Sequence, residues 1–183
     1  MKKMTVYINE LISNLSSLSL DKIDNLSKII HNVKKKNKKI FICGNGGSAA
    51  NANHISNDLM LGMNKKKMGY RFLSLNANVP QLTCIANDLD YSDIFSHQIK
   101  ILGDENDLLI VLSGSGNSKN IIKAIRQAKK QKIYSFGILG YDGGLSKKIC
   151  DNHIHFKTFD MQICEDLQMI IMNQVMKNLR SAF

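Results

Sequence analysis

The sequence predicts an α/β fold in which a parallel sheet of five strands is flanked by helices, as in a flavodoxin-like or Rossmann-like three-layer sandwich. Three observations point to it. Short apolar runs alternate along the chain with stretches of helical periodicity. The apolar runs are continuous rather than alternating, as expected of strands buried on both faces. Two of them are followed by loops rich in glycine and serine that open into helices.

A helical extension precedes the sheet. Two helices are expected, at 4–18 and 21–35, and in the second one apolar residues recur at helical spacing from Leu20 to Val33. Such a pair is more than a single sheet needs. We therefore expect residues 1–36 to act in oligomerisation and residues 37–183 to form the α/β core of one domain.

Strands and helices then alternate to the end of the chain. The expected strands lie at 39–43, 70–75, 107–113, 133–139 and 153–156. The expected helices lie near 47–61, 80–86, 91–101, 118–131, 143–149 and 160–180. Parallel strands joined by helices form an open sheet, and ligands bind such a sheet beyond the carboxyl ends of its strands.

The composition is that of an ordinary globular protein, with 183 residues of which 44% are hydrophobic. No apolar run is long enough to cross a bilayer, and polar residues interrupt the N-terminal stretch, so it does not read as a signal peptide. The net charge is +10, but the lysine runs at 34–39 and 65–67 are more typical of solvated surfaces, and no nucleic-acid motif accompanies them. We therefore expect no membrane partner, and nucleic-acid binding is unlikely on this sequence.

The cysteines carry information about the compartment. Their spacing does not suggest a metal site, and we expect buried free thiols in a cytoplasmic protein. The four cysteines are Cys43, Cys84, Cys150 and Cys164.

The first glycine-rich loop, GNGGSAA at 44–50, partly matches a dinucleotide-binding fingerprint. Gly44, Gly46 and Ala49 fit the pattern G-x-G-x-x-G/A. That fingerprint also needs an acidic residue about 20 positions further on to hold the ribose. Here the second strand runs into SLNANVP, which has none. No nucleotide cofactor is therefore expected at this loop.

The second loop, SGSGNSK at 113–119, favours a phosphate. Ser113, Ser115 and Ser118 surround Gly114 and Gly116, and a helix follows. Hydroxyls and the free N–H groups of a helix start attract an anion. For Ser118 alone, a helix N-cap is the simpler interpretation. Three serines in six residues after a buried strand favour a phosphate site.

His54 and Asp58 are one turn apart on the helix after the first loop and share a face. A surface hydrogen bond, a divalent metal site and acid–base chemistry all use such a pair. Spacing alone leaves these three interpretations open.

These residues carry a family resemblance. CGNGGSAANANHISND at 43–58 is similar to the signature C-G-N-G-G-S-A-A-x-A-x-H-x-x-x-E of the SIS (sugar isomerase) domain in its phosphoheptose isomerase branch. The agreement continues at ANDLDYSDIFSHQI (86–99) and at LSGSGNSKNIIKAI (112–125), so that it covers essentially the whole chain.

The resemblance implies an enzyme that converts sedoheptulose 7-phosphate to D-glycero-D-manno-heptopyranose 7-phosphate, for the heptose of lipopolysaccharide or capsule. It also implies a homotetramer with sites shared between subunits. The alternative is a non-catalytic SIS protein that binds a sugar phosphate or acts as a tetrameric adaptor of the replication-initiator-binding type.

The resemblance also assigns roles to residues. Asp58 takes the place of the family's catalytic Glu, and because the family's catalytic His is missing here, we expect Glu165 to form a catalytic carboxylate pair with Asp58. The expected zinc ligands are His54, Asp58, Glu165 and Asn173. The residues expected to contact the substrate are Asn45, Gly46, Gly47, Ser48, Asn87, Asp88, Ser113, Gly114, Ser115, Ser118 and Glu165.

The sequence departs from the family pattern in the last helix. The family has a Glu where Asp58 stands, and it has a catalytic His where the preferred register places Asn173. Glu165 then takes the place of a Gln ligand, although Gln162 is an alternative one turn earlier. No histidine follows His155. The ligand set thereby becomes rich in oxygen, which shifts its preference away from zinc.

Overall fold

The structure is a computed structural model that describes residues 2–61 and 69–181. The second lysine run, at 65–67, lies outside these residues. One parallel sheet has the strand order β2-β1-β3-β4-β5. The strands are β1 (Ile40–Cys43), β2 (Phe72–Ser74), β3 (Leu108–Ser113), β4 (Tyr134–Leu139) and β5 (Asn152–His155). The helices are α1 (Lys2–Ser16), α2 (Leu20–Lys35), α3 (Gly47–Leu61), α4 (Val79–Asp88), η1 (Tyr91–Asp93, a 3-10 turn), α5 (Ser96–Leu102), α6 (Lys119–Lys130), α7 (Gly144–Ile149) and α8 (Met161–Ser181).

The five-stranded parallel sheet is confirmed, with two local differences. The helix expected near 91–101 is divided into η1 and α5, because the Asp90 side chain accepts the N–H of Ser92 at 2.7 Å and starts a separate short turn. The strand expected at 70–75 is limited to Phe72–Ser74. It is an edge strand that pairs only with β1, so fewer ladder hydrogen bonds define its length.

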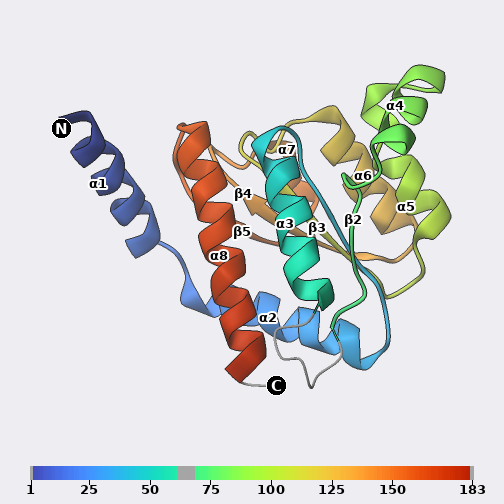
Figure 1. Ribbon diagram of the computed structural model, residues 1–183, viewed down its shortest axis with the longest axis horizontal. Coiled ribbons are helices and arrows are strands. Elements are labelled where there is room, and N and C mark those ends of the chain that lie inside the picture. The colour runs from blue at the N-terminus through green and yellow to red at the C-terminus, as the bar shows by residue number, and fades with distance from the viewer. Residues whose placement is uncertain (1, 62–68, 182–183) are drawn as a thin grey trace.

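Helices cover both faces of the sheet and form two hydrophobic clusters (Figure 1). Along β1, Ile40 and Ile42 belong to the cluster with α2, α3 and α8, whereas Phe41 and Cys43 belong to the cluster with α5 and α6. This alternation follows from the two-residue period of a strand. Every residue of β1 and β3 is buried, which explains why their sequences are continuously apolar.

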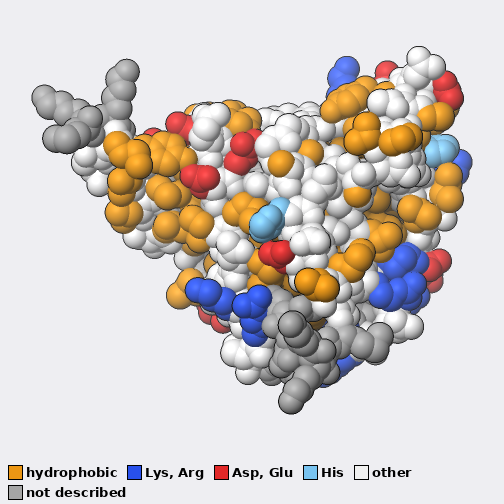
Figure 2. All heavy atoms as spheres, viewed as in Figure 1, with side chains coloured by type: hydrophobic (Ala, Val, Ile, Leu, Met, Phe, Trp, Pro, Cys, Tyr) orange, Lys and Arg blue, Asp and Glu red, His pale blue; other side chains and the backbone are white. Residues whose placement is uncertain are grey.

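Helix α1 leans away from the sheet and contacts the body along one side only (Figure 1). Tyr7 packs against the first cluster, and its hydroxyl donates to Asp166 of α8 at 2.5 Å. Glu10 accepts a hydrogen bond from the Thr158 hydroxyl at 2.7 Å. The other side of α1 exposes hydrophobic side chains (Figure 2). These are Met4, Val6, Ile8 and Ile12, which are 64%, 65%, 42% and 54% exposed.

The thiols agree only partly with the sequence-based expectation. All four cysteines are free, and Cys43 and Cys164 are buried. The prediction is wrong for Cys84, which lies on the exposed side of α4, where its thiol donates to Asp88 at 3.3 Å. Among the described residues, no helix combines the length and the apolar character that a membrane span requires.

Candidate active site

The two glycine-rich loops lie side by side because they follow neighbouring strands. β1 and β3 pair in parallel, with Cys43 opposite Val111. Both strands therefore end at the same edge of the sheet. A reciprocal pair of amides connects the two loops. The Asn45 Nδ2 group donates to Asn120 Oδ1 at 2.9 Å, and Asn120 Nδ2 donates to Asn45 Oδ1 at 2.8 Å.

Tyr91 contributes a third group to this connection. Its hydroxyl donates to Asn45 Oδ1 at 3.2 Å. Tyr91 begins η1, just after the predicted substrate residues Asn87 and Asp88. The orientation of the Asn45 amide is thus fixed by Asn120 and Tyr91.

The first loop is also held from the side of β2. Asn76 accepts the N–H of Gly44 at 3.1 Å and donates to the Gly44 carbonyl at 3.0 Å. Gly46 has φ +57°, a backbone conformation that glycine adopts without strain. Ser48 lies buried in the first turn of α3. The loop is therefore preformed, with backbone exposed at Gly46.

Glu165 lies directly against this loop. A methyl group added at Gly47 would overlap with the Glu165 carboxylate, so glycine is needed there for the close approach. Gly47 is the first residue of α3, and a helix start favours a negative charge. The structure thus places Glu165 against the first loop, and its position as the counterpart of the family's Gln ligand stays a prediction.

The second loop has a different hydrogen-bond arrangement. The hydroxyl of Ser113 accepts the N–H of Gly116 at 3.0 Å, and the hydroxyl of Ser115 accepts the N–H of Asn117 at 3.2 Å. Ser118 occupies the N-cap position of α6, but its side chain makes no capping hydrogen bond. The Ser113 and Ser115 hydroxyls are therefore occupied within the loop, whereas the Ser118 hydroxyl does not cap the helix.

A third glycine-rich loop, at 140–144 after β4, supports the second one. Gly140 N–H donates to the Ser113 carbonyl at 3.1 Å, and Ser146 N–H donates to the Gly116 carbonyl at 2.9 Å. Asn117 Oδ1 accepts the N–H of Leu145 at 2.9 Å. This loop is not among the sites expected from the sequence, although the letters GYDGG directly after a strand are the same kind of signal.

His54 and Asp58 are brought together on α3. His54 Nε2 lies 3.3 Å from Asp58 Oδ2, and the two side chains are 59% and 36% exposed. Histidine and acidic side chains are visible on the face formed by α3 and α8 (Figure 2). The pair is accessible to a ligand from that face.

Of the predicted zinc ligands, His54 and Asp58 are the pair that the structure brings within contact distance. Among the described residues, no set of three or more His, Cys, Asp and Glu side chains is placed to hold a metal ion. His54 and Asp58 are together, but Glu165 does not complete a trio with them. Asn173 is exposed on α8. A structural zinc site needs about four ligands and a catalytic one about three, so the one His–carboxylate pair on α3 would need further donors, and zinc binding stays a prediction.

Other predicted residues lie apart from the loops. Asn87 and Asp88 are exposed at the end of α4, where Asn87 Nδ2 donates to Asp88 Oδ1 at 2.8 Å. That hydrogen bond, together with the one from Cys84, lowers the pKa of Asp88. No hydrogen bond between described residues connects either side chain to the glycine-rich loops. Their role as substrate contacts stays a prediction.

Several site residues were missed from the sequence. Asn120, Tyr91 and Asn76 hold Asn45 and its loop, and Asn51 holds α8 by donating to the Glu165 carbonyl at 2.9 Å. A signal existed for Asn120, since it is the second Asn of the motif SGNSKN. Tyr91 and Asn76 are brought to the site by the fold, and Asn51, on α3, meets Glu165 there; no local pattern identifies these contacts.

Comparison with known proteins agrees with this geometry. The family model described as SIS domain matches residues 5–140. A phosphoheptose isomerase of Campylobacter jejuni (serotype O:6) is 31% identical over 172 residues, which are 94% of this chain and 92% of that protein. A phosphoheptose isomerase of Helicobacter pylori is 37% identical over 135 residues, 74% of this chain and 70% of that protein. The solved structure of a phosphoheptose isomerase from Francisella tularensis superposes with a TM-score of 0.91 at 23% identity, over 97% of this chain and 96% of that one. This chain belongs to the phosphoheptose isomerase family of SIS-domain proteins.

Proposed function

We propose that this chain is a phosphosugar isomerase that converts sedoheptulose 7-phosphate to D-glycero-D-manno-heptopyranose 7-phosphate. The observation that carries the proposal is the Asn45–Asn120 pair. This pair connects the first loop, against which the Glu165 carboxylate lies, with the second loop, which contains three serines. One phosphorylated sugar can therefore contact both loops at once.

The serine loop is the proposed site for the phosphate. Ser118 offers a hydroxyl free of capping, and the first turn of α6 offers N–H groups that no helix carbonyl can accept. The hydroxyls of Ser113 and Ser115 stabilise the conformation of the loop, because each accepts a backbone N–H within it. The phosphate would thus anchor one end of the sugar over a preformed loop.

The opposite end of the sugar would lie near Gly47 and Glu165. A ketose becomes an aldose when a base removes a proton from C1 and a proton is returned to C2, while a second proton moves between the two oxygens. A positioned carboxylate can carry the carbon proton. We assign this role to Glu165, because it lies against the first loop, and we assign the oxygen proton to Asp58 with His54.

We route no step through a metal ion. Of the predicted zinc ligands, His54 and Asp58 are adjacent, and no third His, Cys, Asp or Glu among the described residues joins them. A divalent ion at this pair is a separate proposal, to be tested by titration with zinc and with harder ions such as magnesium, since oxygen ligands favour the latter.

A specific observation supports a second candidate function. Asn cannot titrate, and Asn173 stands where the family pattern has a catalytic His. A non-catalytic protein would keep the serine loop, bind a sugar phosphate, and act as a sensor or as an adaptor.

One experiment separates the two functions. The chain is incubated with sedoheptulose 7-phosphate, with and without added divalent ions, and the sugar is followed by NMR. Appearance of the aldose phosphate supports the isomerase. Binding without turnover under every ion tested favours the sensor or adaptor.

We further propose a homotetramer in the cytoplasm that supplies heptose for lipopolysaccharide or capsule. The exposed apolar side of α1 supports oligomerisation, because a second copy would remove it from water. Four free thiols are typical of a reducing compartment. Light scattering tests the assembly, and a mass of about one chain, 20.6 kDa, would contradict it.

A further inference from the structure

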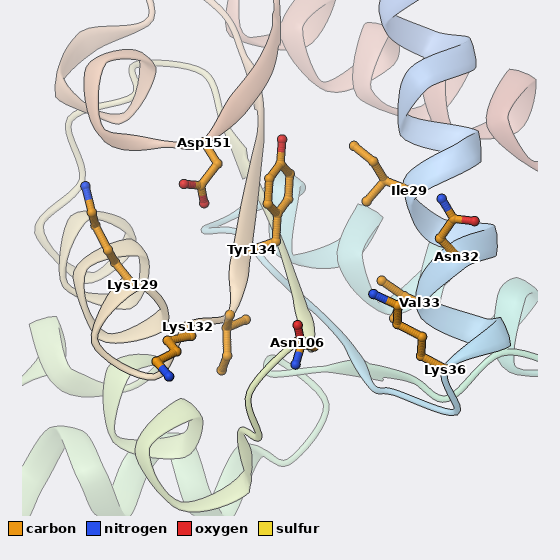
Figure 3. Close-up of a pocket in the computed structure, with 10 residues that line it drawn as sticks. Ile29, Asn32, Val33, Lys36, Asn106, Lys129, Lys132, Tyr134 and Asp151 are labelled. Atoms are coloured by element: carbon orange, nitrogen blue, oxygen red, sulfur yellow. The ribbon is translucent and has the colours of Figure 1, made fainter.

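A cavity of about 400 Å³ lies at the opposite end of the sheet from the glycine-rich loops. It is formed by α2, by the turn after α6 and by the amino ends of β3, β4 and β5 (Figure 3). Its volume is within the range of small-molecule sites, about 300–1,000 Å³. The residues that line it are Ile29, Asn32, Val33, Lys36, Asn106, Lys129, Lys132, Ile133, Tyr134 and Asp151.

The lining of this cavity is positively charged. Three lysines, Lys36, Lys129 and Lys132, oppose one carboxylate, Asp151, so the net charge is 3 − 1 = +2. Asp151 already accepts hydrogen bonds from the N–H and the hydroxyl of Ser135, at 2.8 and 2.6 Å. The Asp151 carboxylate therefore hydrogen-bonds within the wall of the cavity, and the lysines keep their charge for a ligand.

The lysines are available to a ligand. In the part of the chain that the structure describes, neither the Lys36 nor the Lys129 side chain has a hydrogen bond or an ion pair. Lys132 lies 3.3 Å from Glu105, but these side chains are 74% and 56% exposed. Such an exposed pair is weak and gives way to a stronger anion.

The rest of the lining suits a flat, partly apolar group. Tyr134 lies between Lys129 and Lys132 on one side and α2 on the other (Figure 3), and this residue is 38% exposed. Ile29, Val33 and Ile133 add apolar surface, and Asn32 and Asn106 add amides. Aromatic rings stack on nucleobases, and amides hydrogen-bond to the edges of the bases.

We propose that this cavity binds a nucleoside polyphosphate, with the phosphates among the lysines and the base against Tyr134. This inference does not depend on the isomerase function. The site is separated from the sugar-phosphate loops by the length of the strands, so a nucleotide bound here would be an effector rather than a reactant.

The helix ends offer a simpler explanation of the same lysines. Lys36 follows the last turn of α2 and Lys129 lies in the last turn of α6, where positive charge stabilises the helix dipole. Lys35 and Lys130 are in the same two turns and do not line the cavity. They are therefore matched controls, because they have the same charge, the same helix ends and similar exposure.

The test is isothermal titration calorimetry of the chain of 183 residues with ATP, without divalent ions. We expect binding by the wild type, on the order of tenfold weaker binding by the double variant Lys36→Gln/Lys129→Gln, and unchanged binding by Lys35→Gln/Lys130→Gln. A third variant, Lys132→Gly, should bind ATP more weakly without losing stability, since Lys132 has φ +55° at a position where glycine is preferred.

Titrations with fragments of ATP and with a competing sugar phosphate complete the experiment. We expect tripolyphosphate and adenosine each to bind more weakly than ATP, and excess glucose 6-phosphate not to displace ATP. Absence of ATP binding, equal weakening in both double variants, or full displacement by glucose 6-phosphate would each overturn the proposal. Tripolyphosphate that binds as tightly as ATP would overturn the assignment of the base to Tyr134.

Discussion

Asn45 and Asn120 hydrogen-bond to each other through both atoms of each side-chain amide, at 2.9 and 2.8 Å. Asn120 is 1% exposed, and its Oδ1 also accepts the N–H of the buried residue Ile121 at 2.9 Å, so water cannot replace the acceptor that this N–H would lose. Asn120→Ala should therefore reduce the free energy of unfolding by about 1–3 kcal/mol, the cost of leaving a buried polar group unpaired. It should also weaken the binding of a sugar phosphate, because the two loops are no longer tied together.

Tyr91→Phe is the matched comparison for Asn120→Ala. It removes one hydrogen bond of 3.2 Å from a residue that is 59% exposed. Its effect on the unfolding free energy, measured by urea denaturation, should be below about 1 kcal/mol. If the two variants lose equal stability, the amide pair is not what holds the loops.

The contact between Gly47 and Glu165 gives a second prediction. A methyl group at Gly47 overlaps with the carboxylate, which is the flexible end of its side chain and can move. Gly47→Ala should thus fold with little loss of stability but displace the proposed base. We expect kcat to fall by about 10²–10⁴, the usual loss when a positioned acid or base is removed.

A double-mutant cycle tests whether Gly47 acts through Glu165. Glu165→Gln alone should show a similar loss in kcat. The double variant Gly47→Ala/Glu165→Gln should then lose no more activity than Glu165→Gln. Additive losses would indicate that the methyl group blocks the substrate directly.

The order of strands and helices was predictable because continuous apolar runs and helical periods are local signals. The positions of Gly46 and Ser118 were predictable for the same reason, since a turn glycine and an N-cap serine act within a few residues. The contacts of Tyr91, Asn76 and Asn51 were not predictable, because each joins residues that are distant in the chain. Such contacts depend on the register of the sheet and on helix packing, which no local pattern contains.

The serines of the second loop should differ in effect. The Ser118 hydroxyl makes no capping hydrogen bond, so Ser118→Ala should leave the stability of the ligand-free chain nearly unchanged. Ser113→Ala should lower it, because the buried N–H of Gly116 loses its acceptor. Thermal unfolding without ligand distinguishes them.

With ligand, both serine variants should lose stabilisation. For the wild type, a sugar phosphate at one hundred times its Kd should add about 2.7 kcal/mol. A Ser118→Ala chain that keeps the full increment at the same concentration would contradict the phosphate site.

Stability should fall in mild acid because of His155. Its Nε2–H donates to the Tyr141 carbonyl at 3.1 Å, and Nδ1 accepts from Lys147 at 3.2 Å. Burial, with the added charge of Lys147, lowers the pKa of His155 below its usual 6.5. The unfolded chain then binds the proton more readily, so this contribution to stability is complete above pH 6.5 and is lost as the pH falls below it.

The measurement for His155 is urea denaturation at about pH 7.5 and about pH 5.5, a range that lies above most carboxylate titrations. The pKa of His153 is lowered as well, mainly by burial, so the variant that should flatten the profile is His153→Gln/His155→Gln. An equal loss of stability in the wild type and in this variant would assign the acid sensitivity to other groups.

Asp58 and His54, with 3.3 Å between Oδ2 and Nε2, give the last prediction. Asp58→Asn keeps the size of the side chain but removes its charge and its ability to take a proton. Turnover should fall by about 10²–10⁴, while binding of a sugar phosphate persists because the serine loop is unchanged. Glu105→Gln, a charge change on an exposed residue that lies before β3, is the control and should leave both quantities unchanged. Turnover by Asp58→Asn at the wild-type rate would remove Asp58 from the chemistry and leave Glu165 as the only assigned carboxylate. Loss of binding together with turnover would instead mean that Asp58 holds the sugar rather than its protons.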